Sequence, residues 1–554
     1  MNPAIVFEPD GYLPKDGWLM GRQSAGAGFL RAAVLGRGDG PVTAFTPFRA
    51  SAAAFQKAVA QIDPQARAEW ISAQRLDLLA QKGLLYRPDL VLGPAARQRL
   101  RVGPAAYSLC GVTHTLSSHG SLDAIAKILS EPVMPWDALV CTSQVALSVV
   151  TAVLDHEAEY LAWRTGAPPT TRPMLPVIPL GVHAADFAGT AQRREGARAR
   201  LGLAADEVAF LSAGRLSLAG KAHPYATFTA LQAAAEETGK PLVLLFAGQA
   251  RYSSTLEQFR EGAATFCPSV RTVFVEGKDD ARYQDAWAGA DVFISLADSI
   301  QETFGLTPLE AMASGLPALV SDWDGYKDTV RDGLDGFRIA TWAPEPGGGA
   351  TIAHDYEIGL SNYDEYLYQS TAAVALDLGQ LKARLHDLIE DPDLRRRLGA
   401  SGRERARSTF DWAHVYRSYQ ALWAEQTARR QAGANAPDTA AWLSAAPTRG
   451  PDHLGPFDTF AGYPTHHVTA ASIVSLAAAL PTPDYEALIR IPVLTYWAVA
   501  PAVHDRIREA LADGPLTVAA LAGRTTIPEP SMIEVAARLA KIGVLAVAEP
   551  AQRK

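Results

Sequence analysis

The sequence predicts an α/β protein in which two doubly wound domains face a cleft and a small, mainly helical module follows. Two observations predict this fold class. The chain has 554 residues, more than one hydrophobic core usually covers, and short apolar runs alternate with helical patterns in two successive series. Hydrophobic residues make up 48% and charged residues 20% of the chain, which is typical of a globular protein and excludes global disorder.

The first series lies in a predicted domain of residues 1–185 and the second in a predicted domain of residues 186–410. The strand candidates of the first series are Ala4–Phe7, Val42–Phe45, Ala105–Leu109 and Ala138–Thr142. Those of the second are Val208–Ser212, Leu242–Ala247, Thr272–Glu276, Asp291–Leu296 and Ala318–Ser321. The segment Val177–Phe187 between the two series predicts a hinge. Open α/β sheets bind ligands beyond the carboxyl ends of their strands, so we expect a cleft there.

Helical patterns continue after the second series, over Asp377–Thr409 and Asp411–Arg430. Residues 411–431 are predicted to form a closing helix. Small residues and prolines then predict a linker over residues 432–460.

Residues 461–554 predict the small helical module. Its end, PLTVAALAGRTTIPEPSMIEVAARLAKIGVLAVAEP, has the pattern helix, turn, helix and apolar strand, which favours a winged-helix arrangement. Between Ala502 and Lys554 there are seven Lys or Arg against six Asp or Glu, too few excess cations for phosphate contacts with DNA. Protein contacts or dimerisation suit the module better than a role as a DNA-binding regulator.

Charge and cysteine content narrow the partners and the compartment. The net charge of -8 makes nucleic acid an unexpected partner. Cys110, Cys141 and Cys267 are far apart in apolar stretches, so we expect neither disulfides nor a zinc site, and a reducing compartment such as the cytoplasm. The N-terminus carries no export pattern. Apolar stretches such as Val468–Leu480 and Ile491–Ala502 fall short of the roughly 20 residues that span a bilayer. Membrane contact, if it occurs at the inner face, would be peripheral.

The segment DVFISLADSIQETFGLTPLEAMASGLPALVSDWDGY carries the clearest chemistry. A strand ends in a polar loop with Glu302, and a helix with Glu310 follows. The amides of Phe304, Gly305 and Leu306 would stand at the helix N-terminus, where free N–H groups and the helix dipole favour a phosphate. The two glutamates can therefore hold different parts of one anionic ligand.

A second segment, FLSAGRLSLAGKAHPYATFTAL, places Arg215 and Lys221 in a glycine-containing loop between a strand and a helix. Arginine binds a phosphate through two parallel hydrogen bonds and lysine adds a point charge. Together they can neutralise a diphosphate leaving group without a metal ion, so we expect no metal and no cofactor.

These motifs resemble those of the family-four glycosyltransferases, the retaining, GT-B glycosyl transferases group 1. Glu302, seven intervening residues and Glu310 match the E-x7-E pattern of that family, and FGLTPLEAMASGLP is close to its usual text. The resemblance implies that Glu310 accepts hydrogen bonds from the nucleotide ribose and that Glu302 contacts the donor sugar. Arg215 and Lys221 fit the family's basic pair, although Ala222 stands where glycine is usual.

The resemblance implies two further sites in the first domain. GRQSAGAGFLRAA resembles the family's glycine-rich loop, with Gly26 and Gly28 as positions of close approach to the donor phosphates. His114 lies after a strand where the family places a histidine that touches the transferred sugar, and His119 is the alternative.

The expected activity is transfer of a sugar from a UDP- or GDP-linked donor to a glycan or lipid-linked acceptor, as in bacterial polysaccharide biosynthesis. The resemblance implies metal-independent front-side displacement, and no pair of carboxylates resembles those of a hydrolase. The alternatives are an inactive GT-B carbohydrate-binding or scaffold protein and a regulator acting through the C-terminal module. The cluster of Arg97, Arg99 and Arg101 could receive an anionic acceptor, but a solvated face is the favoured interpretation.

Overall fold

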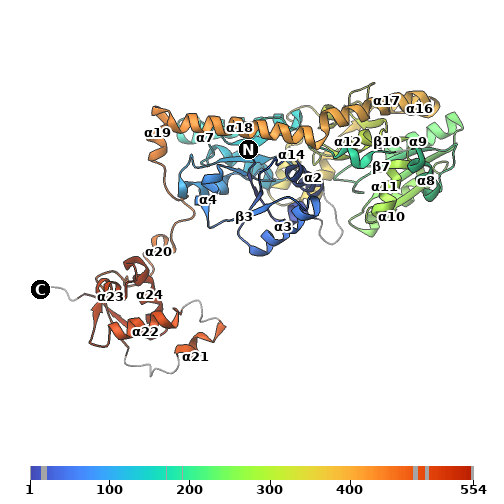
Figure 1. Ribbon diagram of the computed structural model, residues 1–554. Coiled ribbons are helices and arrows are strands. Elements are labelled where there is room, and N and C mark those ends of the chain that lie inside the picture. The colour runs from blue at the N-terminus through green and yellow to red at the C-terminus, as the bar shows by residue number, and fades with distance from the viewer. Residues whose placement is uncertain are drawn as a thin grey trace. The chain divides into compact units, whose positions relative to one another are not determined.

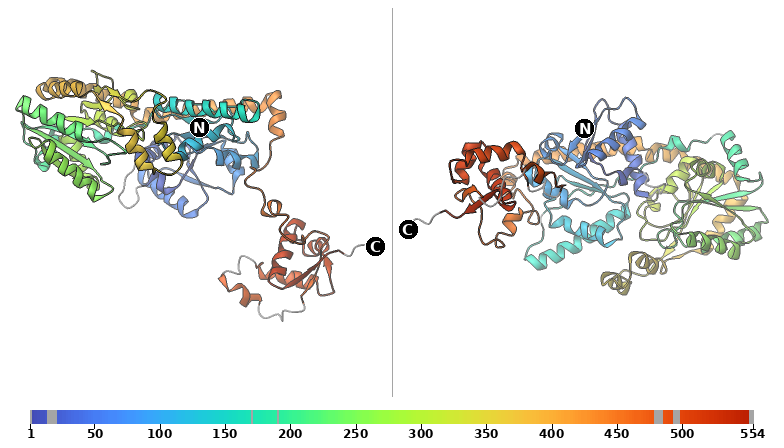
Figure 2. Two further views of the ribbon diagram at one scale, coloured as in Figure 1. Left: turned by 180° about the vertical axis from the view of Figure 1, so that it is seen from behind. Right: turned by 90° about the horizontal axis from the view of Figure 1, so that it is seen from below.

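The computed structural model describes residues 2–13, 21–169, 171–189, 191–477, 485–492 and 498–550. The chain divides into two compact units, Met1–Pro451 and Asp452–Lys554. The first unit contains both α/β domains, which Figure 2 shows as neighbouring lobes in blue and green.

The first α/β domain is built on a parallel sheet of six strands in the order β3-β2-β1-β4-β5-β6. Its strands are β1 (Ala4–Val6), β2 (Val42–Thr46), β3 (Ala68–Ser72), β4 (Leu84–Tyr86), β5 (Ser108–Val112) and β6 (Ala138–Val140). Its helices are α1 (Pro9–Tyr12), α2 (Gly21–Leu35), α3 (Arg49–Ile62), α4 (Leu76–Lys82), α5 (Gly93–Arg99), α6 (His119–Ala126) and α7 (Gln144–Thr165).

The second α/β domain repeats this arrangement, with strands in the order β12-β11-β10-β7-β8-β9. Its strands are β7 (Val208–Ala213), β8 (Leu242–Gly248), β9 (Arg271–Glu276), β10 (Val292–Ser295), β11 (Ala318–Ser321) and β12 (Gly336–Ile339). Its helices are α8 (Ala191–Leu201), α9 (Tyr225–Thr238), α10 (Ser253–Phe266), α11 (Asp280–Gly289), α12 (Leu306–Ser314) and α13 (Tyr326–Thr329). In both sheets the strand order reverses once, between β1 and β4 and between β7 and β10, which is where such folds bind ligands.

Strand burial explains why these segments form parallel sheets. The first six residues of β8, LVLLFA, are all buried, because helices cover both faces of a parallel sheet and leave no polar side. The alternation of such runs with helices confirms the predicted α/β class. Strand β5 lies three residues later than predicted, because Ala106 donates to the carbonyl of Gly103 in a turn that delays the strand.

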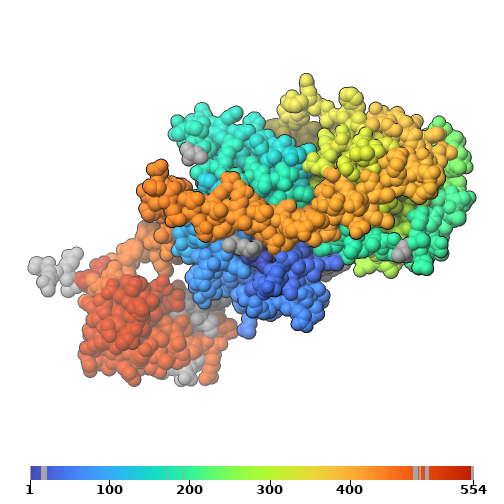
Figure 3. All heavy atoms as spheres, turned by 45° about the horizontal axis from the view of Figure 1, so that its top comes forward, coloured from blue at the N-terminus to red at the C-terminus, as the bar shows by residue number. Residues whose placement is uncertain are grey.

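The chain then returns to the first domain through a series of helices (Figure 1). These are α16 (Leu378–Glu390), α17 (Pro392–Arg405), α18 (Trp412–Asn435) and α19 (Pro437–Ser444). Figure 3 shows α18 in orange as a continuous band along the blue and cyan residues of the first domain. The apolar face of α18 completes a core of that domain, where Trp423 packs against Phe29 and Tyr86.

Helix α18 extends beyond the predicted closing helix. Gly433 and Asn435 lie inside it, although the sequence placed them in a linker. Gly433 is needed for packing, because a Cβ there would approach the Trp136 ring to 2.7 Å. A short helix, α19, follows within the predicted linker.

A helical hairpin is inserted between the short strands β13 (Thr341–Trp342) and β14 (Ala375–Leu376) of the second domain. It consists of α14 (Ala350–Glu357) and α15 (Tyr363–Thr371). Asn362 caps α15 in a reciprocal arrangement with Glu365, which fixes where the second helix begins.

The second unit combines helices with a three-stranded antiparallel sheet in the order β16-β15-β17. Its elements are α20 (Pro456–Thr459), β15 (Ile473–Leu476), α21 (Tyr485–Ile489), α22 (Pro501–Ala510), β16 (Leu516–Thr517), α23 (Val518–Thr525), α24 (Glu529–Lys541) and β17 (Leu545–Ala548). The winged-helix assignment stays a prediction.

The described parts of the chain contain no helix with the length and apolar character needed to cross a membrane. Residues 478–480 and 493–497 of the two apolar stretches singled out in the sequence lie outside the described ranges.

Candidate functional site

A cleft of about 380 Å³ lies between the two α/β domains. On one side it is lined by the start of α2 and by the loop after β5, and on the other by loops at the carboxyl ends of β7, β8, β9 and β10. The loops after β7 and β10 border the point where the order of the second sheet reverses, as expected for a ligand site.

Lys221 and Glu302 meet in this cleft as an ion pair. The Lys221 ammonium comes from the loop after β7, and the Glu302 carboxylate from the loop after β10, where its side chain is 10% exposed. A phosphate bound here would share the lysine with Glu302. The two groups that the sequence assigned to the leaving group and to the sugar are therefore in direct contact.

The N-terminus of α12 opens into the same cleft. Phe304, Gly305 and Leu306 all line it, with Gly305 as the residue that precedes the helix. Gly305 has φ +83°, and a Cβ would lie 2.1 Å from the Tyr326 ring, so only glycine fits. The backbone N–H groups and the dipole of α12 thus provide an anion-binding end next to Lys221 and Glu302.

Glu310 lies one turn further along α12 and also lines the cleft. Burial raises the pKa of its carboxyl to about 7, and the Lys221 charge opposes this shift. Tyr283 of α11 faces Glu310, whose charge adds to the burial that raises the phenol pKa. The carboxylate is thus available to accept hydrogen bonds from ligand hydroxyls once it is ionised.

Arg215 belongs to a chain of hydrogen bonds that crosses between the domains. Its Nη2 donates to Gln301 Oε1 at 3.0 Å, and Gln301 Nε2 donates to the Tyr363 hydroxyl at 3.3 Å. The Tyr363 hydroxyl also lies 2.8 Å from Ser117 Oγ of the first domain. Tyr363 of the inserted hairpin and Gln301 therefore link Ser117 of the first domain to the arginine that the sequence assigned to the diphosphate.

His114 is the histidine that the structure places in the cleft. Burial lowers the pKa of its imidazole to about 4, so the ring is neutral at pH 7. Its carbonyl accepts a hydrogen bond from Thr303 Oγ1, next to Glu302. His119, the alternative, is not among the lining residues and instead stacks on Tyr356 of the hairpin with ring centroids 3.8 Å apart.

The prediction of a glycine-rich loop at Gly26 and Gly28 is wrong, because both glycines lie inside α2. A Cβ at Gly26 would meet the Gly11 carbonyl oxygen at 2.1 Å, and one at Gly28 would meet Trp412 Nε1 at 2.5 Å. The two glycines allow α2 to pack against its neighbours and do not line the cleft. The start of the same helix does, through Gly21, Arg22 and Ser24.

The cluster Arg97, Arg99 and Arg101 is neither an acceptor patch nor a solvated face. The Arg99 side chain is fully buried and forms two hydrogen bonds of 2.7 Å with Asp137, which is also fully buried. Arg97 pairs with Glu131 at 2.9 Å, and Arg101 is exposed. The first two arginines tie parts of the first domain together.

Sequence reasoning missed Gln301, Tyr363 and Asp324. Gln301 stands within the quoted motif and could have been considered, but nothing in the sequence links Tyr363 to it across 62 positions. Asp324 has φ +47° and its side chain is largely buried. Burial and the nearby Glu302 charge raise the pKa of Asp324 to about 8. What marks Asp324 is its left-handed backbone conformation, which is uncommon for a residue other than glycine. This conformation can be seen in the structure but not in the sequence.

Comparisons with known proteins find similarity to glycosyltransferases. A family model described as glycosyl transferases group 1 matches residues 193–345, which include Arg215, Lys221, Glu302 and Glu310. A D-inositol 3-phosphate glycosyltransferase of Nocardia farcinica is 32% identical over 157 residues, 27% of this chain and 34% of that protein. One of Nocardioides is 26% identical over 59% of this chain and 63% of that protein. The matched regions thus span less than two thirds of these relatives.

The fold also has a solved counterpart. The HepE protein of Anabaena, whose structure was determined in complex with UDP, aligns over 76% of this chain and all of its own, with a TM-score of 0.50 and 15% identity. This likeness confirms the predicted GT-B architecture of two α/β domains. Within the second domain, residues 193–345 are similar to the glycosyl transferases group 1 family.

Proposed function

We propose that this protein is a retaining glycosyltransferase that moves a sugar from a UDP- or GDP-linked donor to a glycan or lipid-linked acceptor without a metal ion. The observation that carries the proposal is the convergence of Lys221, Glu302, Glu310 and the N-terminus of α12 in one cleft, with His114 facing them from the other domain. A cytoplasmic location, with any membrane contact peripheral, is part of this proposal.

In this proposal the donor diphosphate lies at the N-terminus of α12. Lys221 and Arg215 supply the opposite charge, and the helix amides donate hydrogen bonds to the phosphate oxygens. Glu310, when ionised, accepts hydrogen bonds from the nucleotide ribose. Glu302 accepts from hydroxyls of the donor sugar, and the neutral His114 ring contacts the same sugar from the first domain.

The proposed reaction is a front-side displacement. The acceptor oxygen forms a bond to the anomeric carbon as the bond from that carbon to the leaving phosphate oxygen breaks, on the same face of the sugar. The acceptor proton passes to the departing diphosphate, whose developing charge is stabilised by Lys221, Arg215 and the amides. Catalysis then depends on positioning and charge stabilisation, to which closure of the two domains contributes.

Calorimetric titration with UDP- and GDP-sugars in EDTA tests donor binding. We expect one nucleotide class to bind and Glu310→Ala to weaken its binding by about tenfold or more, because the ribose loses a charged acceptor. Exposed Glu404 on α17 offers a control, Glu404→Ala, that should leave affinity unchanged. Absence of binding by every donor, or binding only when a divalent metal is added, would contradict the proposal.

Turnover and stereochemistry need a second experiment. Slow hydrolysis of an α-linked donor, followed by proton NMR, should first release the α-anomer if the configuration is retained. Initial release of the β-anomer would overturn the retaining assignment. Donor binding with neither transfer nor hydrolysis would favour the alternative of an inactive carbohydrate-binding or scaffold protein.

A further inference from the structure

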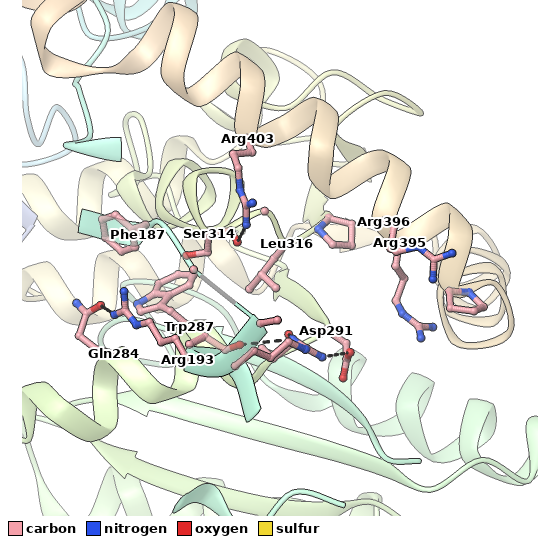
Figure 4. A pocket seen from close by; sticks show the side chains of 18 residues that line it. Phe187, Arg193, Gln284, Trp287, Asp291, Ser314, Leu316, Arg395, Arg396 and Arg403 are labelled. Carbon is pink, nitrogen blue, oxygen red and sulfur yellow. Dashed lines mark hydrogen bonds and ion pairs between the residues drawn. The ribbon is translucent and has the colours of Figure 1, made fainter. Parts of the chain in front are cut away.

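A second cavity, of about 440 Å³, lies in the second α/β domain and shares none of its lining residues with the cleft. Figure 4 shows its wall, formed by the start of α8, the end of α11, the end of α12 and by α17. Phe187 and Trp287 give it an apolar side, with ring centroids 6.0 Å apart. Its volume is in the range of small-molecule sites.

Five arginines line this cavity, whereas Asp291 is the one acidic residue among the described lining residues. They are Arg193, Arg194, Arg395, Arg396 and Arg403. Asp291 is already paired with Arg194 at 2.6 Å and with Arg198 at 3.1 Å. Arg396 forms an ion pair with Asp393, which is not a lining residue. The lining still carries more positive than negative charge, and a concave site concentrates the field of such charges.

Neutral backbone and amide oxygens hold several of these guanidinium groups in place. Arg403 donates to the Ser314 carbonyl at 2.6 Å, Arg395 to the Leu388 carbonyl at 2.5 Å, and Arg193 to Gln284 Oε1 at 3.1 Å. A neutral oxygen holds a guanidinium group in position but does not compensate its positive charge. Burial lowers the pKa of Arg395, against the opposing charge of Asp291, and Arg194 lowers it further. Arg395 and Arg403 are thus preorganised cations, which is the arrangement that phosphate-binding sites use.

The cavity lies at the opposite ends of two helices that line the cleft. Helix α12 presents Leu306 and Glu310 to the cleft and Ser314 to the cavity. Helix α11 presents Tyr283 to the cleft and Trp287 to the cavity. Arg403 meets the carbonyl end of α12, the negative end of its dipole. An anion that draws Arg403 towards itself would therefore change the environment of the helix that receives the donor phosphates.

We propose that this cavity binds a small phosphorylated anion and that its occupancy alters donor affinity through α12. Anion binding is inferred from the residues of the cavity alone. The effect on donor affinity rests in addition on the proposed function of the cleft. Reciprocity of linked equilibria requires that donor binding alter anion affinity by the same factor.

Calorimetric titration of the full chain with fructose 1,6-bisphosphate and with inorganic triphosphate, at low ionic strength, tests anion binding. Arg396→Glu is the informative variant, because that side chain is 74% exposed and loses only a surface ion pair with Asp393, so the charge reversal should not disturb folding. We expect affinity to fall about tenfold or more in Arg396→Glu and in Arg403→Gln. Arg75→Glu, at an exposed arginine of the first domain, is the matched control and should leave affinity unchanged.

A third variant, Lys221→Ala, separates the cavity from the cleft. Anion affinity that survives Lys221→Ala but falls in Arg396→Glu supports the proposal, even if no donor is found. If only Lys221→Ala lost affinity, the anion would occupy the cleft and the proposal would be overturned. Equal affinity in all variants, or no binding by either anion, would also overturn the proposal. Coupling is then measured as the change in donor dissociation constant with bisphosphate present, expected to be at least about fivefold. An unchanged donor dissociation constant would refute the coupling but would not contradict the anion-binding site.

Discussion

Asp137 is a buried carboxylate, and both of its oxygens have hydrogen-bond partners. Both of its oxygens bond Arg99, and they also accept the backbone N–H groups of Leu109 and Met134 at 2.7 Å. These bonds tie α5 to the start of β5 and to the turn before β6. Arg99 was noticed in the sequence only as part of a charge cluster, because sequence alone cannot tell a buried arginine from an exposed one when its acid lies 38 positions away.

Replacing Arg99 with Met should lower the free energy of unfolding by about 3–5 kcal/mol, because Asp137 would be left as an uncompensated buried charge. Denaturant unfolding followed by circular dichroism measures the change. Arg101→Met, two positions on at an exposed side chain, should alter it by less than about 0.5 kcal/mol. Similar losses in the two variants would show that the ion pair does not support the domain.

Glu310 predicts how donor binding depends on pH. Its raised pKa, about 7, means that much of the carboxyl is protonated near pH 6 and ionised at pH 8. The ionised form is the better acceptor for ribose hydroxyls, so affinity for a nucleotide sugar should rise with pH across this window, by up to about tenfold per unit below the pKa. The phosphates of a nucleotide sugar do not titrate there, and His114, with a pKa of about 4, stays neutral.

Calorimetric titration at several pH values measures this dependence, with Glu310→Gln as the isosteric control. The control should remove most of the slope. A wild-type affinity that is constant from pH 6 to pH 8 would contradict the assignment of Glu310 to the ribose.

Among the elements, long buried strands were the most predictable. β2, β7 and β8 are apolar runs that could be located from the sequence to within one or two residues. β3, β4 and β12 were missed for identifiable reasons. β4 has only three residues, β12 is a four-residue segment that begins with glycine, and β3 is an edge strand, AEWIS, with two exposed positions. Short or half-exposed strands lack the pattern that distinguishes a strand from a loop.

Tertiary packing also overrode local sequence signals. The small residues of GRQSAGAGFLRAA suggested a loop, yet they form α2, because glycines there let neighbouring backbone and Trp412 approach closely. In the second domain, the positions of Glu302 and Glu310 around the start of α12 could be predicted, since a strand, a glycine and a helix follow in order. Contacts made by the α14–α15 hairpin could not, because they join residues more than 200 positions apart.

The hairpin yields a test of how domain contact supports the site. Tyr363→Phe removes the hydroxyl that links Ser117 to Gln301 and so loosens the partner of Arg215. One neutral hydrogen bond is worth about 0.5–1.5 kcal/mol, so kcat/KM should fall by about two- to tenfold. Steady-state kinetics with the donor found by titration would measure it.

Tyr368→Phe is the matched control, since Tyr368 lies on the same helix and is 48% exposed. It should leave kcat/KM unchanged. If Tyr363→Phe behaved like this control, the hydrogen-bond chain would have no part in positioning Arg215.

On the scale of the whole first unit, the chain crosses between the α/β domains twice, and the two crossings lie side by side. Val182 donates to the Phe410 carbonyl at 2.8 Å and accepts from the Trp412 N–H at 3.1 Å. The first crossing lies in the segment Val177–Phe187, which the sequence predicted as the hinge. Two adjacent connections allow the domains to rotate about one line, while Trp412 anchors the start of α18 to the first domain.

The two compact units of the chain should fold and unfold independently. Val474, Ile507 and Leu539 belong to a hydrophobic cluster made entirely of residues after Pro451, whereas the residues that line the cleft all come before it. A unit with its own core unfolds cooperatively by itself. The full chain should therefore show two calorimetric transitions, and a chain that ends at Pro451 should lose one of them and keep the donor-dependent stabilisation of the other. If the shortened chain failed to fold, or folded without responding to donor, the second unit would have to support the first or complete its site.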